Sequence, residues 1–82
     1  MDTKEQVLAI LKEVKPTKNL ENVTDIIEGG YIDSFELMSL VSKLSEVFNI
    51  EITINELIPE NFNSLDAMSN MVNVLKNKNN EI

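Results

Sequence analysis

The sequence predicts an all-α fold, a small bundle of three main helices plus one short helix. Apolar residues recur at helical spacing in three separate segments of the chain. The one stretch that alternates like a β-strand has no second such stretch to pair with. The chain of 82 residues is 43% hydrophobic, which suits the core of one small domain. We expect that domain over residues 1–76, followed by a polar C-terminal tail, residues 77–82, that frays.

The first helix is expected over residues 3–14. Its apolar residues fall at positions i, i+3, i+4 and i+7 and therefore share one face: Val7, Ile10, Leu11 and Val14. Pro16 biases Lys15 away from helical angles, so the helix should end there.

A long connection over residues 15–32 follows the first helix. Its apolar residues are expected to tuck under the helices, with one short turn near residues 24–27: Leu20, Val23, Ile26 and Ile27. The pair Gly29-Gly30 then permits a tight bend. A connection of this length is unusual in a small domain and points to a packed or functional loop.

The second helix is expected over residues 33–48. Asp33 with Glu36 three residues later has the form of a capping box, which makes Asp33 the N-cap and Ser34 the first helical residue. Asn49 can supply the left-handed residue that ends the helix. The apolar face of this helix is predicted to consist of Leu37, Leu40, Val41, Leu44, Val47 and Phe48.

Residues 50–54 alternate between isoleucine and polar residues. Because no partner strand exists, we expect an extended linker whose isoleucines point inward. A short third helix is expected over residues 55–58, ended by Pro59.

The last helix is expected over residues 64–76. Asn63 or Ser64 can cap its start, since both side chains accept hydrogen bonds from backbone N–H groups. The residues predicted to lie on its apolar side are Leu65, Met68, Met71, Val72 and Leu75.

Composition excludes several kinds of site. The chain has no cysteine and no histidine, so it lacks thiol chemistry and the commonest general base. All seven basic residues are lysine, which leaves no arginine fork for a phosphate. A hydrolase that used Ser34 as its nucleophile would have no evident base beside it. We therefore predict that the chain is no enzyme, and we predict no metal site.

The net charge of −7 is concentrated in the middle of the chain. Residues 21–66 hold ten acidic residues and one lysine. Such a surface repels nucleic acid and anionic membranes and favours partners with basic patches, although net charge also serves solubility alone. No apolar run approaches the ~20 residues that span a bilayer, and the N-terminus has no signal-peptide pattern. We expect a cytoplasmic monomer that does not insert stably into membranes.

Ser34 is the candidate functional residue. A serine at the first helical position presents a primary hydroxyl where backbone N–H groups point outward. An anion attached there would lie near the positive end of the helix dipole. The structural alternative is that Ser34 is an ordinary helix-capping residue.

The segment around Ser34 resembles the acyl and peptidyl carrier protein family, the carriers of fatty-acid, polyketide and nonribosomal peptide synthesis. Asp33-Ser34-Phe35 is similar to the Asp-Ser-Leu attachment motif of that family, with Phe for Leu. Two further segments, residues 46–52 and 59–65, are similar to the exit from the family's second helix and the entry to its last helix. The resemblance covers essentially the whole chain.

The resemblance implies that a phosphopantetheinyl transferase moves 4'-phosphopantetheine from coenzyme A onto the Ser34 hydroxyl, beside Asp33. The thiol of that arm would carry an acyl or aminoacyl group as a thioester. Acyl-transferring, condensing or adenylating enzymes with basic patches would be the other partners. The resemblance places five residues on the partner-facing side, the last two as acidic contacts: Phe35, Met38, Ser42, Glu36 and Glu46.

The chain also departs from the family's bacterial fatty-acid carriers. Tyr31-Ile32 stands where those carriers have two small residues, and four residues make the second helix less acidic: Ser39, Ser42, Lys43 and Ser45. These features are similar to those of peptidyl, D-alanyl and specialised carriers. A peptidyl or D-alanyl carrier therefore stays open as an alternative, as does a helical interaction domain that carries no arm.

Overall fold

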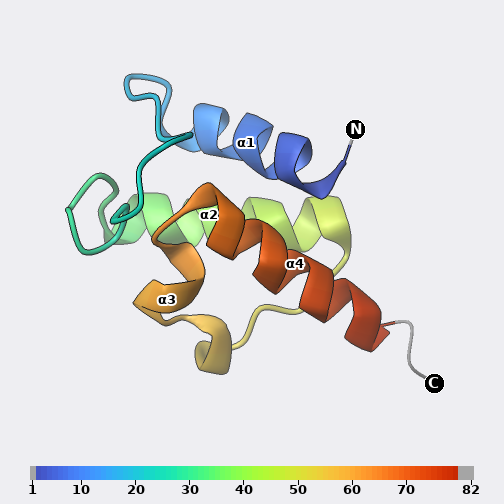
Figure 1. The fold of residues 1–82 in the computed structure, drawn as a ribbon. Coiled ribbons are helices and arrows are strands. Elements are labelled where there is room, and N and C mark those ends of the chain that lie inside the picture. Colours follow the sequence, from blue (N-terminus) through green and yellow to red (C-terminus); the bar gives the residue numbers. More distant parts are fainter. Residues whose placement is uncertain (1, 80–82) are drawn as a thin grey trace.

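The computed structural model describes residues 2–79, and these form an all-helical bundle (Figure 1). In chain order the elements are α1 (Thr3–Val14), α2 (Ser34–Phe48), the 3-10 helix η1 (Ile54–Glu56), α3 (Pro59–Phe62) and α4 (Leu65–Asn79). The prediction of three main helices and one short helix is confirmed.

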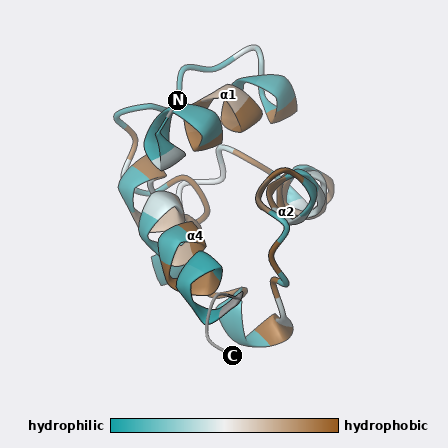
Figure 2. Ribbon diagram, turned by 90° about the vertical axis from the view of Figure 1, so that its right-hand side faces the viewer, coloured by the Kyte–Doolittle hydropathy of each residue, from teal (hydrophilic) through white to brown (hydrophobic). Residues whose placement is uncertain are grey.

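The three long helices pack around one core. α1 contacts both α2 and α4, and the short α3 packs on α4. Figure 2 shows α2 end-on, with α1 above it and α4 beside it. The start of α2, the long loop before it and α3 all lie at the same end of the bundle (Figure 1). This arrangement places the predicted functional serine at that end.

The core draws side chains from every long helix and from the long loop. Its buried members are Val7, Ile10, Leu11, Leu20, Ile26, Ile32, Leu40, Val41, Leu44, Ile50, Phe62, Leu65, Met68, Met71, Val72 and Leu75. All five residues predicted for the apolar side of the last helix are among them. Val47 was expected inside but is 54% exposed, because it lies at the edge of the apolar stripe in the last turn of α2.

The ends of α1 and α2 follow the local sequence. The Asp2 side chain accepts a hydrogen bond from the Glu5 N–H at 2.8 Å and caps α1. α1 ends at Val14, and the next residue, Lys15, has left helical angles before Pro16. α2 ends at Phe48, and the φ of 53° at Asn49 is the left-handed stop that was predicted.

The segment between α2 and α4 differs from the prediction. Pro59 begins α3 instead of ending a helix over 55–58, since the first helical position needs no N–H donor. Ile58 before it is extended, as the residue before proline prefers. Thr53 caps the 3-10 turn η1, which ends the extended segment early. The turn directs Ile54 outward, so its predicted inward orientation was wrong: the side chain is 82% exposed.

Ser64 caps α4. Its hydroxyl oxygen accepts a hydrogen bond from the Ala67 N–H at 3.0 Å. α4 continues to Asn79, three residues past the predicted end at 76. Lysines in its last turn, Lys76 and Lys78, favour this extension because they oppose the negative end of the helix dipole. The rest of the predicted tail, residues 80–82, lies outside the described residues.

Within residues 2–79 no helix has the length and apolar content needed to cross a bilayer.

Candidate functional site

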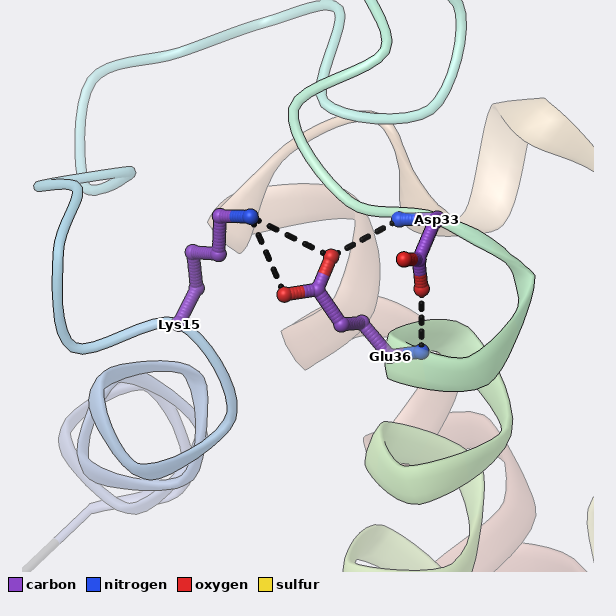
Figure 3. Close-up of polar contacts among 3 residues, drawn as sticks. All are labelled: Lys15, Asp33 and Glu36. Atoms are coloured by element: carbon purple, nitrogen blue, oxygen red, sulfur yellow. Dashed lines mark hydrogen bonds and ion pairs between the residues drawn. The ribbon is translucent and has the colours of Figure 1, made fainter.

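A capping box fixes where α2 begins. The Asp33 carboxylate accepts a hydrogen bond from the Glu36 N–H at 2.8 Å, and the Glu36 carboxylate accepts one from the Asp33 N–H at 2.9 Å (Figure 3). Asp33 itself is extended, with φ −95° and ψ −176°, which is the geometry of an N-cap. The predicted capping box is therefore confirmed, and Ser34 is the first residue of the helix.

Ser34 is exposed at this helix start. Among the described residues, none forms a hydrogen bond with its hydroxyl. The N–H groups of Ser34 and Phe35 belong to the first helical turn and have no acceptor within the helix. They lie at the positive end of the α2 dipole, which favours an anion close by. The geometry thus combines a reachable hydroxyl with a local preference for negative charge.

Lys15 brings a positive charge to the same place. Its ammonium lies 3.0 Å from Glu36 Oε2 and 3.3 Å from Glu36 Oε1 (Figure 3). Both side chains are about three-quarters covered, with exposures of 25% and 24%. One Glu36 carboxylate therefore both completes the capping box and ties the end of α1 to the start of α2. The role of Lys15 could not be predicted from the sequence, because a pair 21 positions apart leaves no local pattern.

The loop before Ser34 is held by the joint between α3 and α4. The backbone carbonyl and the side chain of Asn63 bind the turn over residues 25–30 through four hydrogen bonds. The glycines of this turn are needed for different reasons. A Cβ on Gly29 would lie 2.6 Å from the Asp25 carbonyl oxygen, and Gly30 has a φ of +73°.

Four of the five predicted partner-facing residues form one exposed stripe along α2. Phe35 is 88% exposed and Met38 is 55% exposed, while Ser42 and Glu46 are also exposed. Their spacing of three, four and four residues keeps them on a single helix face. This stripe begins directly beside Ser34, so a partner that covers it would also reach the hydroxyl.

Glu36, the fifth predicted residue, does not belong to the stripe. Its carboxylate is turned toward Lys15 and the Asp33 N–H (Figure 3). Lys43, three residues before Glu46 on α2, lies 3.4 Å from the Glu13 carboxylate. Glu46 therefore supplies the acidic charge of the stripe, and Glu36 acts within the chain.

Within residues 2–79 no group of three or more acidic side chains is placed so that it could hold a metal ion.

The family model described as phosphopantetheine attachment site matches residues 5–72 of the chain. The matched region runs from α1 into the middle of α4 and contains Ser34 and its capping box. No match was found among curated proteins.

Proposed function

The chain belongs to the phosphopantetheine attachment site family, and on that premise we propose that Ser34 bears the arm and that the chain presents an acyl or aminoacyl group to synthesis enzymes. Carriers of this family hold a covalently attached 4'-phosphopantetheine. The arm supplies a thiol for thioester chemistry, which this cysteine-free chain cannot supply itself.

The observation that carries the proposal is the exposed Ser34 hydroxyl at the first position of α2. Its oxygen can attack the phosphorus of coenzyme A that bears the pantetheine, which breaks the P–O bond of the pyrophosphate bridge and releases adenosine 3',5'-bisphosphate. The serine proton passes to a base of the transferase. The N–H groups of the first turn and the helix dipole then favour the new phosphodiester.

Lys15 supports the same reaction through charge. Asp33 and Glu36 are two acids beside Ser34 and would repel an incoming phosphate. The Lys15 ammonium, 3.0 Å from Glu36, offsets one of these negative charges. Asp33 stays exposed, so its carboxylate is available to a cation that accompanies coenzyme A in the transferase.

The stripe on α2 is the surface that we propose for partners. An aromatic side chain that is 88% exposed, such as Phe35, gains stabilisation when a partner covers it. Glu46 at the far end of the stripe would orient partners that carry basic patches. The transferase and the acyl-transferring, condensing or adenylating enzymes would share this surface because all of them must reach the same arm.

The chain itself supplies no catalysis in this proposal. It has neither cysteine nor histidine. Lys15, which contacts the start of α2, is already paired with Glu36. Coenzyme A and the activated cargo are met in the cytoplasm, which we propose as the site of action. The cargo can be an acyl group or a peptidyl or D-alanyl group. In each case the low acidity of α2 favours partner enzymes that recognise the apolar part of the stripe.

The test is loading by a broad-specificity transferase with coenzyme A, followed by intact-mass measurement. We expect the chain to gain the mass of one phosphopantetheine and Ser34→Ala to gain none. Ser39→Ala removes another exposed hydroxyl of α2 and should load normally. If Ser34→Ala still gains the arm, or if the unmodified sequence never does, the assignment of Ser34 is wrong and a helical interaction domain is the better account.

A further inference from the structure

Asn63 binds the loop before Ser34 through its backbone and its side chain. Its backbone carbonyl accepts a hydrogen bond from the Ile26 N–H at 2.9 Å. Its side-chain oxygen accepts two more, from the N–H groups of Ile27 at 3.0 Å and Glu28 at 3.1 Å. Its side-chain nitrogen donates to Glu28 Oε1 at 2.7 Å. Four hydrogen bonds thus converge from three consecutive loop residues on one asparagine, 35 to 37 positions later in the chain.

The turn that Asn63 holds leads directly to Ser34. Within it, the Gly29 N–H donates to the Asp25 carbonyl and the Tyr31 N–H donates to the Ile26 carbonyl at 3.0 Å. Ile26 within the turn is fully buried, and Ile32, two residues after the turn, is 6% exposed, so the core holds the chain on both sides of the two glycines. Only Asp33 separates Ile32 from Ser34. A change in the position of the turn therefore changes the approach of the chain to the α2 N-cap.

We propose that Asn63 is a positioning residue for the modification of Ser34. The inference rests on the proposed function, since it takes Ser34 as the attachment point. Asn63 couples the α3–α4 joint to the attachment loop and keeps the loop in the one conformation that presents the serine hydroxyl to the transferase. It does not touch the reacting atoms, and it acts through the turn over residues 25–30.

Asparagine suits this position because its side chain is both a donor and an acceptor. The oxygen has two lone pairs for the N–H groups of Ile27 and Glu28, and the nitrogen can bind a carboxylate. Aspartate would keep the acceptor but would set its second oxygen against the Glu28 carboxylate, 2.7 Å from the present nitrogen. Alanine would leave the N–H groups of Ile27 and Glu28 to water and keep only the backbone hydrogen bond from Ile26, which would loosen the turn.

The first experiment compares Asn63→Ala with a control on the same short segment. Asn61→Ala removes a hydrogen bond of similar length, from the Asn61 side chain to the Glu56 carbonyl at 2.9 Å, without touching the loop. With transferase and coenzyme A, we expect Asn63→Ala to raise the KM for the carrier about tenfold, because a loosened loop populates the competent conformation only part of the time. The kcat should stay within about twofold, and Asn61→Ala should behave as the unmodified sequence does.

The second experiment exchanges the donor and the acceptor in the hydrogen bond between the side chains of Asn63 and Glu28. Asn63→Asp should raise the KM as Asn63→Ala does, because two carboxylates then face each other. Adding Glu28→Gln turns that contact into an amide donating to a carboxylate, restores the hydrogen bonds and leaves the net charge as it was. The double variant should reverse most of this rise in KM. Far-UV circular dichroism at the assay temperature checks that each variant compared is folded.

Three results would overturn the inference: Asn63→Ala with an unchanged KM, Asn63→Ala no worse than Asn61→Ala, or a double variant that stays as impaired as Asn63→Asp. The comparison of Asn63→Asp with the double variant holds even if the alanine variant does not fold. Failure of the proposed function looks different, since then the unmodified sequence takes up no arm or Ser34→Ala still does.

Discussion

Among single residues, Glu36 makes two structural contacts with one side chain. Its carboxylate accepts a hydrogen bond from the Asp33 N–H at 2.9 Å and lies 3.0 Å from the Lys15 ammonium. The first contact belongs to the helix cap, and the second joins α1 to α2. Because both contacts fix the backbone beside Ser34, they also define where the hydroxyl is presented.

Two substitutions of Glu36 separate these contacts. Glu36→Gln keeps an oxygen for the Asp33 N–H and loses the ion pair, which should cost less than about 1 kcal/mol of unfolding free energy. Glu36→Ala loses both contacts and should cost about 1–2 kcal/mol. Urea denaturation at neutral pH measures both values. Equal losses for the two variants would mean that the capping contact contributes nothing.

At the scale of elements, η1 is a short turn whose start depends on a charged hydrogen bond. The Glu56 carboxylate accepts hydrogen bonds from the Thr53 hydroxyl and from the Thr53 N–H, each at 2.7 Å. The side-chain hydrogen bond from Thr53 is the main cause that holds the pKa of Glu56 below its ordinary value of 4.5. The capping box of Thr53 and Glu56 also turns Ile54 outward.

The lowered pKa of Glu56 predicts a pH dependence with a definite sign. Because the folded chain binds this proton less tightly than the unfolded chain, the stabilisation is fully present above about pH 4.5 and is lost as pH falls through the folded pKa. The unmodified sequence should therefore exceed Glu56→Gln in unfolding free energy at pH 7, and the gap should close in acid. Denaturant titrations at several pH values measure the gap, and a constant gap would contradict the prediction.

The exposed stripe on α2 leads to a prediction about partners. Phe35→Ser should leave the unfolding free energy within about 0.5 kcal/mol, because the ring is 88% exposed. It should lower kcat/KM for loading by the transferase at least about tenfold, as the loss of an interface anchor does. Val47→Ser is the matched control, since Val47 is also an exposed apolar residue of α2 but lies off the stripe. If the two variants load equally well, the stripe is not the docking surface.

For the molecule as a whole, a contact could be predicted from the sequence only where its residues lie close together along the chain. The α2 start was predicted correctly because its two capping residues lie only three positions apart, and the core faces of α1 and α4 follow from helical spacing. The outward orientation of Ile54 was not predicted, because the alternation over residues 50–54 indicates an extended segment up to Ile54. In the structure Thr53 caps η1, so the extended segment ends before Ile54. Contacts between distant segments have no local signature, which explains why two were found only in the structure: the Lys15–Glu36 pair and the Asn63 hydrogen bonds.

These contacts between segments far apart in the sequence hold the end of the bundle that contains Ser34. α1 is tied to the start of α2 by Lys15, and the α3–α4 joint is tied to the loop before Ser34 by Asn63. All three long helices thus help to hold one end of the molecule, where the serine hydroxyl is exposed. In a domain whose total stability is of the order of 4–12 kcal/mol, such contacts are a considerable share.

Peptide-level mass spectrometry of the protein taken from its own cell would locate the arm directly. We expect one phosphopantetheine on the peptide that contains Ser34, with fragmentation placing it on that residue. Protein that is fully unmodified, or an arm placed on Ser39, Ser42 or another hydroxyl, would contradict it.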